Sequence, residues 1–340
     1  MEPIIYQYEA PLTLECGATL PRVDIAYHTY GTLSPQKDNV IWVCHALTAN
    51  SEVADWWPHT VEEGRFLDPN KWFVVCANVL GSCYGTTGHA SINPETGKPY
   101  YGSFPNVTVR DMVYCHQLLA KHLGISHVRL LIGASIGGYQ AIEWAATDPE
   151  WADRFAFLFT APKVTPWIAA FNESQRMAIE LDPTYGDETE MAGRNGMAVA
   201  RSIGLLSYRG GSGYNISQAD KGDEPSVFAH RVQSYQRYQG EKLRRRYDCY
   251  AYVRMCNAVD SHDIARGRGT MAEVLRTIQR PTLLMACTTD LIFPPAEQEE
   301  MRVNIPNNTF RLIDSPFGHD GFLVEYEQLD AIIQEFMSNH

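Results

Sequence analysis

Short apolar segments recur along the chain, and polar or helix-like stretches separate them. Six of these segments predict strands: residues 39–44, 72–78, 128–132, 155–160, 282–290 and 309–314. Continuous apolar runs of this kind are typical of strands that are buried on both faces of a sheet. Residues 4–31 alternate in patches instead, which indicates antiparallel strands. Apolar residues at helical spacing lie between several of the strands, so the pattern predicts an α/β protein with a mostly parallel sheet and helices on both faces.

A different pattern fills the middle of the chain. From residue 167 to residue 278 the strand-like runs stop, and helical patterns rich in Arg, Gln, Glu and Met replace them. We interpret 167–278 as a helical lid inserted into a core formed by 1–166 and 279–340. Residues 210–226 are polar and Gly-rich, which predicts a mobile loop within the lid.

Composition narrows the classes of protein. The chain has 340 residues, of which 45% are hydrophobic, enough for a large core with a sizeable insertion. Its net charge of −12 argues against general binding to nucleic acids or anionic membranes, because both need a basic face. No apolar run approaches the ~18 residues of a membrane span, and residues 1–17 show no signal-peptide pattern. The eight cysteines form no C-x-x-C pair, so we expect mostly buried thiols and a reducing, cytoplasmic location.

The segment 128–146 combines an apolar strand, a Gly-rich turn and a helical pattern. The turn, Gly133-Ala134-Ser135-Ile136-Gly137, matches the G-x-S-x-G nucleophile elbow. Such an elbow raises the serine hydroxyl above the sheet and directs the backbone N–H of Ile136 toward a developing oxyanion. A five-residue match also occurs by chance, and a serine nucleophile needs a base and a residue that orients the base.

Both further residues follow later strands. Asp290 ends the segment 282–290, and His319 lies in the loop after 309–314. The order Ser135, Asp290, His319 is the one found in α/β-hydrolases, and open α/β sheets place their sites at the carboxyl ends of strands. Taken separately, Asp290 could be a turn residue and His319 a surface histidine. The shared order and position favour a catalytic triad in an α/β-hydrolase fold.

A loop after the first apolar strand completes the predicted site. Residues 45–50 occupy the place where α/β-hydrolases carry their second oxyanion donor, and we assign that donor to the backbone N–H of Leu47. We expect a structural role for His45. The His, Cys, Asp and Glu residues do not cluster at ligand spacing, so no metal site is predicted.

Longer motifs resemble the homoserine O-acyltransferases, a family of the α/β-hydrolase superfamily. The matching stretches span nearly the whole chain: 45–57, 66–113, 132–145, 207–209, 237–252, 260–269, 290–298 and 318–325. The family elbow usually reads G-G-S-M-G-G-M-Q. Here Ala134, Ile136 and Tyr139 differ from it, close to where an acyl group would rest.

The resemblance implies a ping-pong transfer of an acetyl group from acetyl-CoA to L-homoserine in methionine biosynthesis, with acetyl-CoA as co-substrate and no other cofactor. It also implies that Arg209 binds the carboxylate of homoserine and Asp320 its ammonium group, with Tyr238 a weaker candidate for the same pocket. The resemblance further implies a homodimer formed through the lid helices. The run 244–246 is either a solvated helix face or a contact for CoA phosphates.

Several alternatives stay open at this level. Succinyl transfer and serine as the acceptor belong to the same class of reaction. A carboxylic-ester or thioester hydrolase would share the elbow and the triad, but it would not need a pair of groups that bind a zwitterion.

Overall fold

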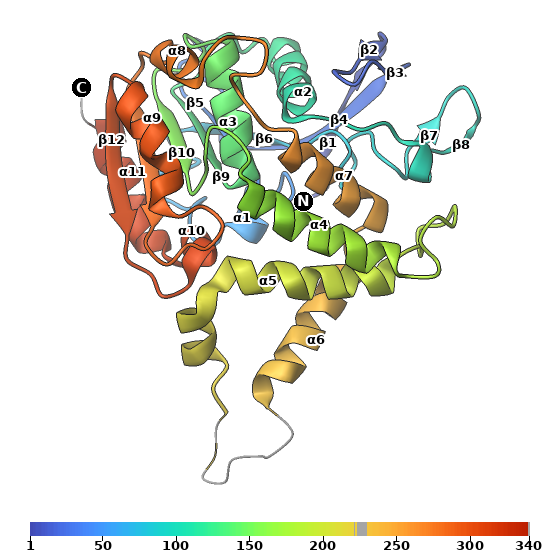
Figure 1. Ribbon diagram of the computed structural model, residues 1–340. Coiled ribbons are helices and arrows are strands. Elements are labelled where there is room, and N and C mark those ends of the chain that lie inside the picture. The colour runs from blue at the N-terminus through green and yellow to red at the C-terminus, as the bar shows by residue number, and fades with distance from the viewer. Residues whose placement is uncertain (221, 223–229, 339–340) are drawn as a thin grey trace.

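The computed structural model describes residues 1–220, 222 and 230–338. Its main sheet has eight strands in the order β1-β4-β6-β5-β9-β10-β11-β12 (Figure 1). Their bounds are β1 Ile4–Tyr8, β4 Val23–Tyr30, β6 Phe73–Ala77, β5 Val40–Cys44, β9 Leu130–Ala134, β10 Phe155–Leu158, β11 Thr282–Cys287 and β12 Asn308–Ile313. All neighbouring strands from β6 to β12 pair in parallel. Strand β4 pairs antiparallel with both of its neighbours, β1 and β6. The predicted α/β class and mostly parallel sheet are therefore confirmed.

Side chains alternate between the two faces of this sheet because successive Cβ atoms of a strand point in opposite directions. In β5, Val40 and Trp42 pack into the core on one face, whereas Ile41 and Val43 pack into the core on the other. Neither face meets water, which explains why the central strands read as unbroken apolar runs.

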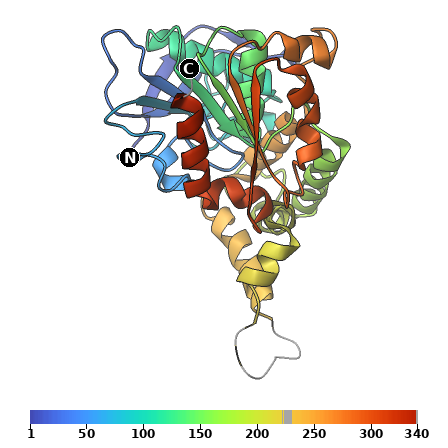
Figure 2. The ribbon, with the colours of Figure 1, turned by 90° about the vertical axis from the view of Figure 1, so that its left-hand side faces the viewer.

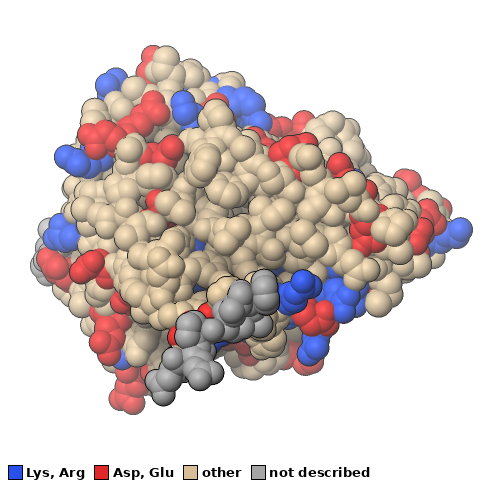
Figure 3. All heavy atoms as spheres, turned by 60° about the horizontal axis from the view of Figure 1, so that its bottom comes forward, with Lys and Arg blue, Asp and Glu red and all other residues tan. Residues whose placement is uncertain are grey.

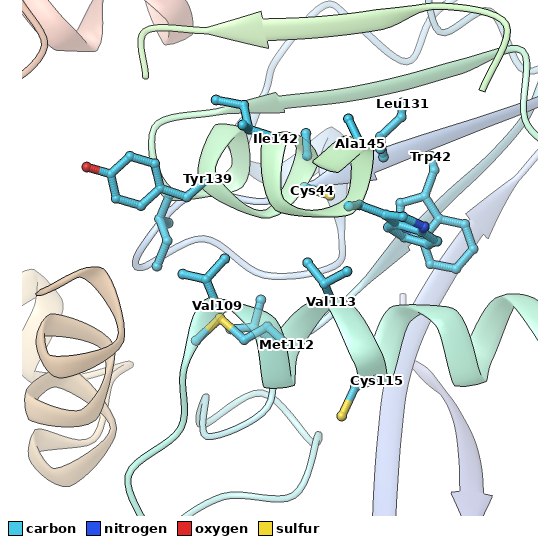
Figure 4. Packing of buried hydrophobic residues seen from close by; sticks show 14 of the residues in the cluster. Trp42, Cys44, Val109, Met112, Val113, Cys115, Leu131, Tyr139, Ile142 and Ala145 are labelled. Atoms are coloured by element: carbon cyan, nitrogen blue, oxygen red, sulfur yellow. The ribbon is translucent and has the colours of Figure 1, made fainter. Parts of the chain in front are cut away.

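Helices cover each face. On the first face lie α2 (Val109–His122) and α3 (Ile136–Thr147). Figure 4 shows Val109, Met112 and Val113 of α2 directed toward α3. On the second face α11 (Tyr326–Ser338) packs against the sheet (Figure 2), with α1 (Val53–Trp56) contributing to the same core.

Smaller elements connect these layers. They are β2 (Leu12–Thr13), β3 (Thr19–Leu20), β7 (Ile92–Asn93), β8 (Lys98–Pro99), α9 (Glu299–Asn304), α10 (Gly321–Val324) and the 3₁₀ helices η1 (Tyr101–Ser103), η2 (Pro295–Gln298) and η3 (Gly318–Asp320). None of the helices in the described part of the chain is long and apolar enough to cross a membrane.

Between β10 and β11 the chain forms α4 (Pro166–Glu180), α5 (Arg194–Ser217), α6 (Arg231–Arg244), α7 (Cys249–Asp260) and α8 (Met271–Arg276). In Figure 1, α5 and α6 lie below the sheet and extend away from it. Residues of α4 to α7 share a hydrophobic cluster of their own, which includes Ile179, Met197 and Tyr252. In contrast, Met271 and Leu275 of α8 pack into the core of the sheet. By packing, α8 therefore belongs with the core, although it lies inside the predicted insertion 167–278.

The prediction of a mobile loop over 210–226 is wrong for its first part. Helix α5 continues to Ser217 and is only kinked at Gly210, where φ is 62° and ψ is 165°. Tertiary contacts hold this Gly-rich turn in place: the hydroxyl of Ser212 donates to the carbonyl of Pro316 at 2.9 Å, and that of Tyr214 donates to Gln236 at 3.1 Å. Residues 221 and 223–226 of the predicted loop lie outside the described residues.

Candidate active site

Ser135 sits in a strained turn between β9 and α3. Its φ of 60° and ψ of −128° lie in a region that non-glycine residues rarely adopt. The backbone is held from two sides: the Ser135 N–H donates to Leu158 at 3.1 Å, and Thr160 donates to the Ser135 carbonyl at 3.0 Å. These bonds keep the turn fixed, as a nucleophile elbow requires.

Glycines flank Ser135 for a steric reason. A Cβ atom on Gly133 would lie 2.0 Å from the carbonyl oxygen of Gly137, and one on Gly137 would lie 2.1 Å from that of Cys44. The strand and helix thus approach too closely for any side chain at either position. The G-x-S-x-G spacing is therefore a packing requirement of this turn.

Asp290 and His319 form the second part of the site. Nδ1 of His319 lies 2.8 Å from Oδ2 of Asp290, and both side chains are buried. The other carboxylate oxygen of Asp290 accepts the backbone N–H groups of Ile292 and Phe293 at 2.8 and 2.9 Å. These bonds fix the carboxylate, so it can orient the imidazole through Nδ1.

The remaining nitrogen of His319, Nε2, is the one that a catalytic triad uses for proton transfer. Nε2 is buried and has no hydrogen-bond partner in the described part of the structure. Aromatic rings surround the imidazole, among them Phe293 at 5.3 Å and Phe322 at 5.4 Å between ring centroids. Ser135 and His319 line the same pocket, which has a volume of about 880 Å³.

The two predicted oxyanion donors also line this pocket. Ile136 begins α3, and the first N–H groups of a helix have no partner within it. Leu47 lies in the loop after β5, which His45 holds: its Nδ1 donates to the Ala46 carbonyl at 2.9 Å, and its Nε2 accepts from the Val79 N–H at 3.2 Å. Burial lowers the pKa of His45 to about 4, so the ring is neutral. The structural role expected for His45 is confirmed.

Residues from the segment between β10 and β11 also reach the pocket. Tyr247, just beyond α6, donates its hydroxyl to the Leu47 carbonyl at 3.2 Å and so helps to position the loop that carries this predicted donor. Phe171 of α4 and Tyr208 of α5 line the same pocket as Ser135 and His319, and the ring centroids of Tyr208 and His319 are 6.2 Å apart. The helices between β10 and β11 therefore supply part of the lining around Ser135 and His319.

Arg209 and Asp320 come together in the same pocket. Nε of Arg209 donates to Oδ2 of Asp320 at 2.9 Å, with side chains 26% and 15% exposed. Among the described residues, the two Nη groups of Arg209 and Oδ1 of Asp320 form no other hydrogen bond. A cationic and an anionic group thus stand side by side, each with free hydrogen-bonding capacity.

Two predicted site residues are not among those that line the pocket: Asp290, which is bonded to the pocket-lining His319, and Tyr238. It lies on α6 with 59% of its side chain exposed, and it is not among the pocket-lining residues. Conversely, the sequence reasoning missed Tyr208, Arg201, Gln175 and Lys242, which do line the pocket. Tyr208 is adjacent to Arg209 in a motif already identified, and Arg201 lies eight residues earlier on α5. Helical spacing from Arg209 is the signal that could have indicated Arg201.

Comparisons with known proteins agree with this geometry. A family model described as the alpha/beta hydrolase fold matches residues 39–326. Homoserine O-acetyltransferase from Cyclobacterium marinum is 42% identical over 335 residues, covering 98% of this chain and 95% of that protein. Homoserine O-acetyltransferase from Chlorobaculum tepidum is 40% identical over 334 residues, covering 97% of this chain and 93% of that protein.

Solved structures show the same fold. The homoserine O-acetyltransferase from Bacillus anthracis superposes with a TM-score of 0.90 at 25% identity, covering 99% of this chain and 97% of that one. Esterase E22 superposes with a TM-score of 0.90 at 24% identity, covering 99% of this chain and 100% of that one. The fold is thus common to transferases and esterases. The sequence identities of 42% and 40% over nearly the whole chain, however, are to homoserine O-acetyltransferases. The chain belongs to the alpha/beta hydrolases and, within them, to the homoserine O-acetyltransferase family.

Proposed function

We propose that this protein transfers the acetyl group of acetyl-CoA to the hydroxyl of L-homoserine, a step of methionine biosynthesis. The observation that carries the proposal is the Arg209–Asp320 pair in the pocket of Ser135 and His319. Homoserine is a zwitterion, and such a pair matches its carboxylate and its ammonium group. Acetyl-CoA is the co-substrate, and the proposed chemistry uses no further cofactor.

The first half-reaction forms an acetyl-enzyme. Nε2 of His319 takes the proton of the Ser135 hydroxyl, whose oxygen attacks the thioester carbonyl. The backbone N–H groups of Leu47 and Ile136 bind the oxyanion of the tetrahedral intermediate. The intermediate collapses as the carbon–sulfur bond breaks, and the imidazolium of His319 gives its proton to the leaving CoA thiolate. Asp290 keeps the imidazole in one tautomer throughout.

The second half-reaction reverses these roles. His319 takes the proton of the homoserine hydroxyl, whose oxygen attacks the acetyl carbonyl on Ser135. The same two N–H groups bind the second oxyanion. Ser135 then leaves and recovers its proton from His319. The product is O-acetyl-homoserine and the enzyme returns to its starting state.

Arg209 and Asp320 can bind homoserine while they remain paired with each other. The bond between Nε of Arg209 and Oδ2 of Asp320 occupies one donor and one acceptor. The Nη groups of Arg209 can bind the carboxylate of homoserine, while Oδ1 of Asp320 binds its ammonium group. The position of these two groups beside the triad supports acyl transfer over hydrolysis.

A comparison of donors and acceptors tests the proposal. Purified protein is incubated with acetyl-CoA or succinyl-CoA, alone or with L-homoserine or L-serine, and released CoA thiol is measured. We expect rapid release only with acetyl-CoA and homoserine together. Equal release with and without an acceptor would identify a thioester hydrolase, and faster reaction with succinyl-CoA or serine would identify another acyltransferase of the family.

The role of Arg209 has its own test. Arg209→Ala removes the group that binds the carboxylate, so kcat/KM for homoserine should fall by about 10- to 100-fold, as expected for a lost charge-assisted bond. Formation of the acetyl-enzyme, followed by mass spectrometry without acceptor, should persist. Loss of acylation in this variant would contradict the assigned role.

A homodimer through the lid, in a cytoplasmic enzyme, completes the proposal. Several large apolar side chains of α5 and α6 are exposed, among them Val199, Leu206, Ile216 and Tyr238. Figure 3 shows that the middle of this face carries few charged residues. Large exposed apolar patches mark interaction sites, and we propose that these side chains form such a patch. Sedimentation velocity should show a dimer that Leu206→Asp dissociates and that Ile92→Asp, on β7, leaves intact. A monomeric wild-type protein would exclude the dimer.

A further inference from the structure

The charges that line the pocket differ in sign from those of the chain as a whole. The chain carries a net charge of −12, yet the pocket is lined by four basic side chains and two acidic ones. The basic residues are Arg201, Arg209, Lys242 and Arg246, and the acidic ones are Asp55 and Asp320. Arg209 and Asp320 neutralise each other. The rest of the pocket therefore retains an excess of positive charge, which favours an anionic ligand.

Two of these cations stand at the end of α6, on the face that meets the pocket. Lys242 lies in the last turn of α6 and Arg246 lies two residues after the end of the helix, and both side chains line the pocket. Their neighbours behave differently. Arg244 and Arg245 both form ion pairs with Glu241, and neither lines the pocket. The four basic residues of 242–246 thus fall into two groups. Arg244 and Arg245 pair with Glu241, whereas Lys242 and Arg246 line the pocket.

Within the described part of the chain, neither Lys242 nor Arg246 has a carboxylate partner. No hydrogen bond or ion pair within the described residues involves Lys242. The guanidinium of Arg246 donates only to neutral groups: Nη1 donates to the Thr48 carbonyl at 2.6 Å and to the hydroxyl of Tyr84. These bonds fix its position without a direct ion pair to a carboxylate. A fixed cation and a free cation in the lining of one pocket are suited to binding phosphate groups.

The location within the pocket matches one part of the proposed donor. Lys242 and Arg246 are exposed, whereas His319 is buried. The basic pair thus lies at the outer end of the pocket, and the reacting groups lie at the inner end. In acyl-CoA the thioester and the phosphates stand at opposite ends of the pantetheine arm. We propose that Lys242 and Arg246 bind the phosphate groups of the acyl-CoA donor, an inference that rests on the proposed function.

A donor without phosphates provides the test. Wild-type protein, Lys242→Glu and Arg246→Met are assayed with acetyl-CoA and with S-acetyl-N-acetylcysteamine, which carries the same thioester but no phosphate. The measured quantity is the ratio of kcat/KM for acetyl-CoA to kcat/KM for the short thioester. Damage to the acylation machinery affects both donors and cancels in this ratio. We expect each variant to lower the ratio about tenfold, chiefly through KM for acetyl-CoA.

Arg245→Ala is the matched control, because its side chain belongs to the same basic run but pairs with Glu241. It should leave the ratio at the wild-type value. An unchanged ratio in Lys242→Glu and Arg246→Met, or an equal fall in Arg245→Ala, would overturn the assignment. Failure of the wild-type protein to use either thioester would instead contradict the proposed function itself.

Discussion

At the scale of single residues, the geometry of the site is set by a few residues whose conformations are tightly constrained. The turn at Ser135 is strained, and neither Gly133 nor Gly137 has room for a Cβ atom. Asp290 is held by two backbone N–H groups and in turn holds His319. Strain and pre-orientation of this kind are typical of catalytic groups, because reorganisation is then avoided during the reaction.

Asp290→Asn tests this arrangement with little change of shape. The amide removes the negative charge and allows the wrong tautomer of His319, so kcat should fall by about 10⁴-fold, as for other triads. Ser135→Ala should abolish formation of the acetyl-enzyme. Steady-state kinetics and mass spectrometry measure the two effects, and unchanged thermal unfolding shows that each variant is folded. Activity of Asp290→Asn near that of the wild type would exclude Asp290 from the triad.

At the scale of elements, the second half of α5 is positioned by its kink. Gly210 adopts a φ of 62° and a ψ of 165°, which only glycine tolerates without strain. The helix then resumes and packs on the segment before His319: a Cβ on Gly213 would lie 2.9 Å from the Pro316 carbonyl oxygen. The kink follows Arg209 directly, so it sets where that side chain meets Asp320.

Adjacent glycines make the kink testable. Gly210→Ala places a side chain in the strained conformation and should destabilise the protein by about 1–3 kcal/mol. Gly211→Ala should instead stabilise it by up to about 1 kcal/mol, because a Cβ there meets no atom within 4 Å and alanine favours helix. Denaturant unfolding of both variants gives the comparison. Equal changes in the free energy of unfolding would mean that the conformation at Gly210 does not require glycine.

At the scale of the whole molecule, four of the buried histidines in the described residues have a pKa that burial lowers. Burial lowers the pKa of His45 and His116 to about 4 and that of His89 and His262 to about 3. The unfolded chain binds protons at these histidines below pH ~6.5, whereas the folded chain does not. Their contribution to stability is therefore complete above pH ~6.5 and is lost as the pH falls toward 3–4.

Thermal unfolding between pH 7.5 and 5 should show this loss. Each histidine contributes a slope of up to about 1.4 kcal/mol per pH unit. His116→Gln removes one titrating group, and an amide can still reach Gln140, to which His116 Nε2 is bonded at 2.9 Å. The variant should lose less stability than the wild type over the same pH range. A slope identical to that of the wild type would exclude this explanation.

Much of the core could be predicted from local pattern. The six predicted strands each coincide with an observed strand to within a few residues, because strands buried on both faces must be apolar throughout. The lid was harder. The Gly-rich composition of 210–217 indicated a loop, but contacts with Pro316 and Gln236 stabilise a helix there. Composition carries no information about such distant partners.

The sequence by itself determined the fold class, the elbow at Ser135 and the order of Ser135, Asp290 and His319. These features are local, since each depends on a strand, a tight turn or the residue that follows a strand. Tertiary structure decided the rest. It joined Arg209 of the lid to Asp320 of the core, kept Tyr238 away from the pocket, and placed Lys242 and Arg246 on its rim. Such distances depend on how α5 and α6 pack over the sheet, which no local pattern of residues specifies.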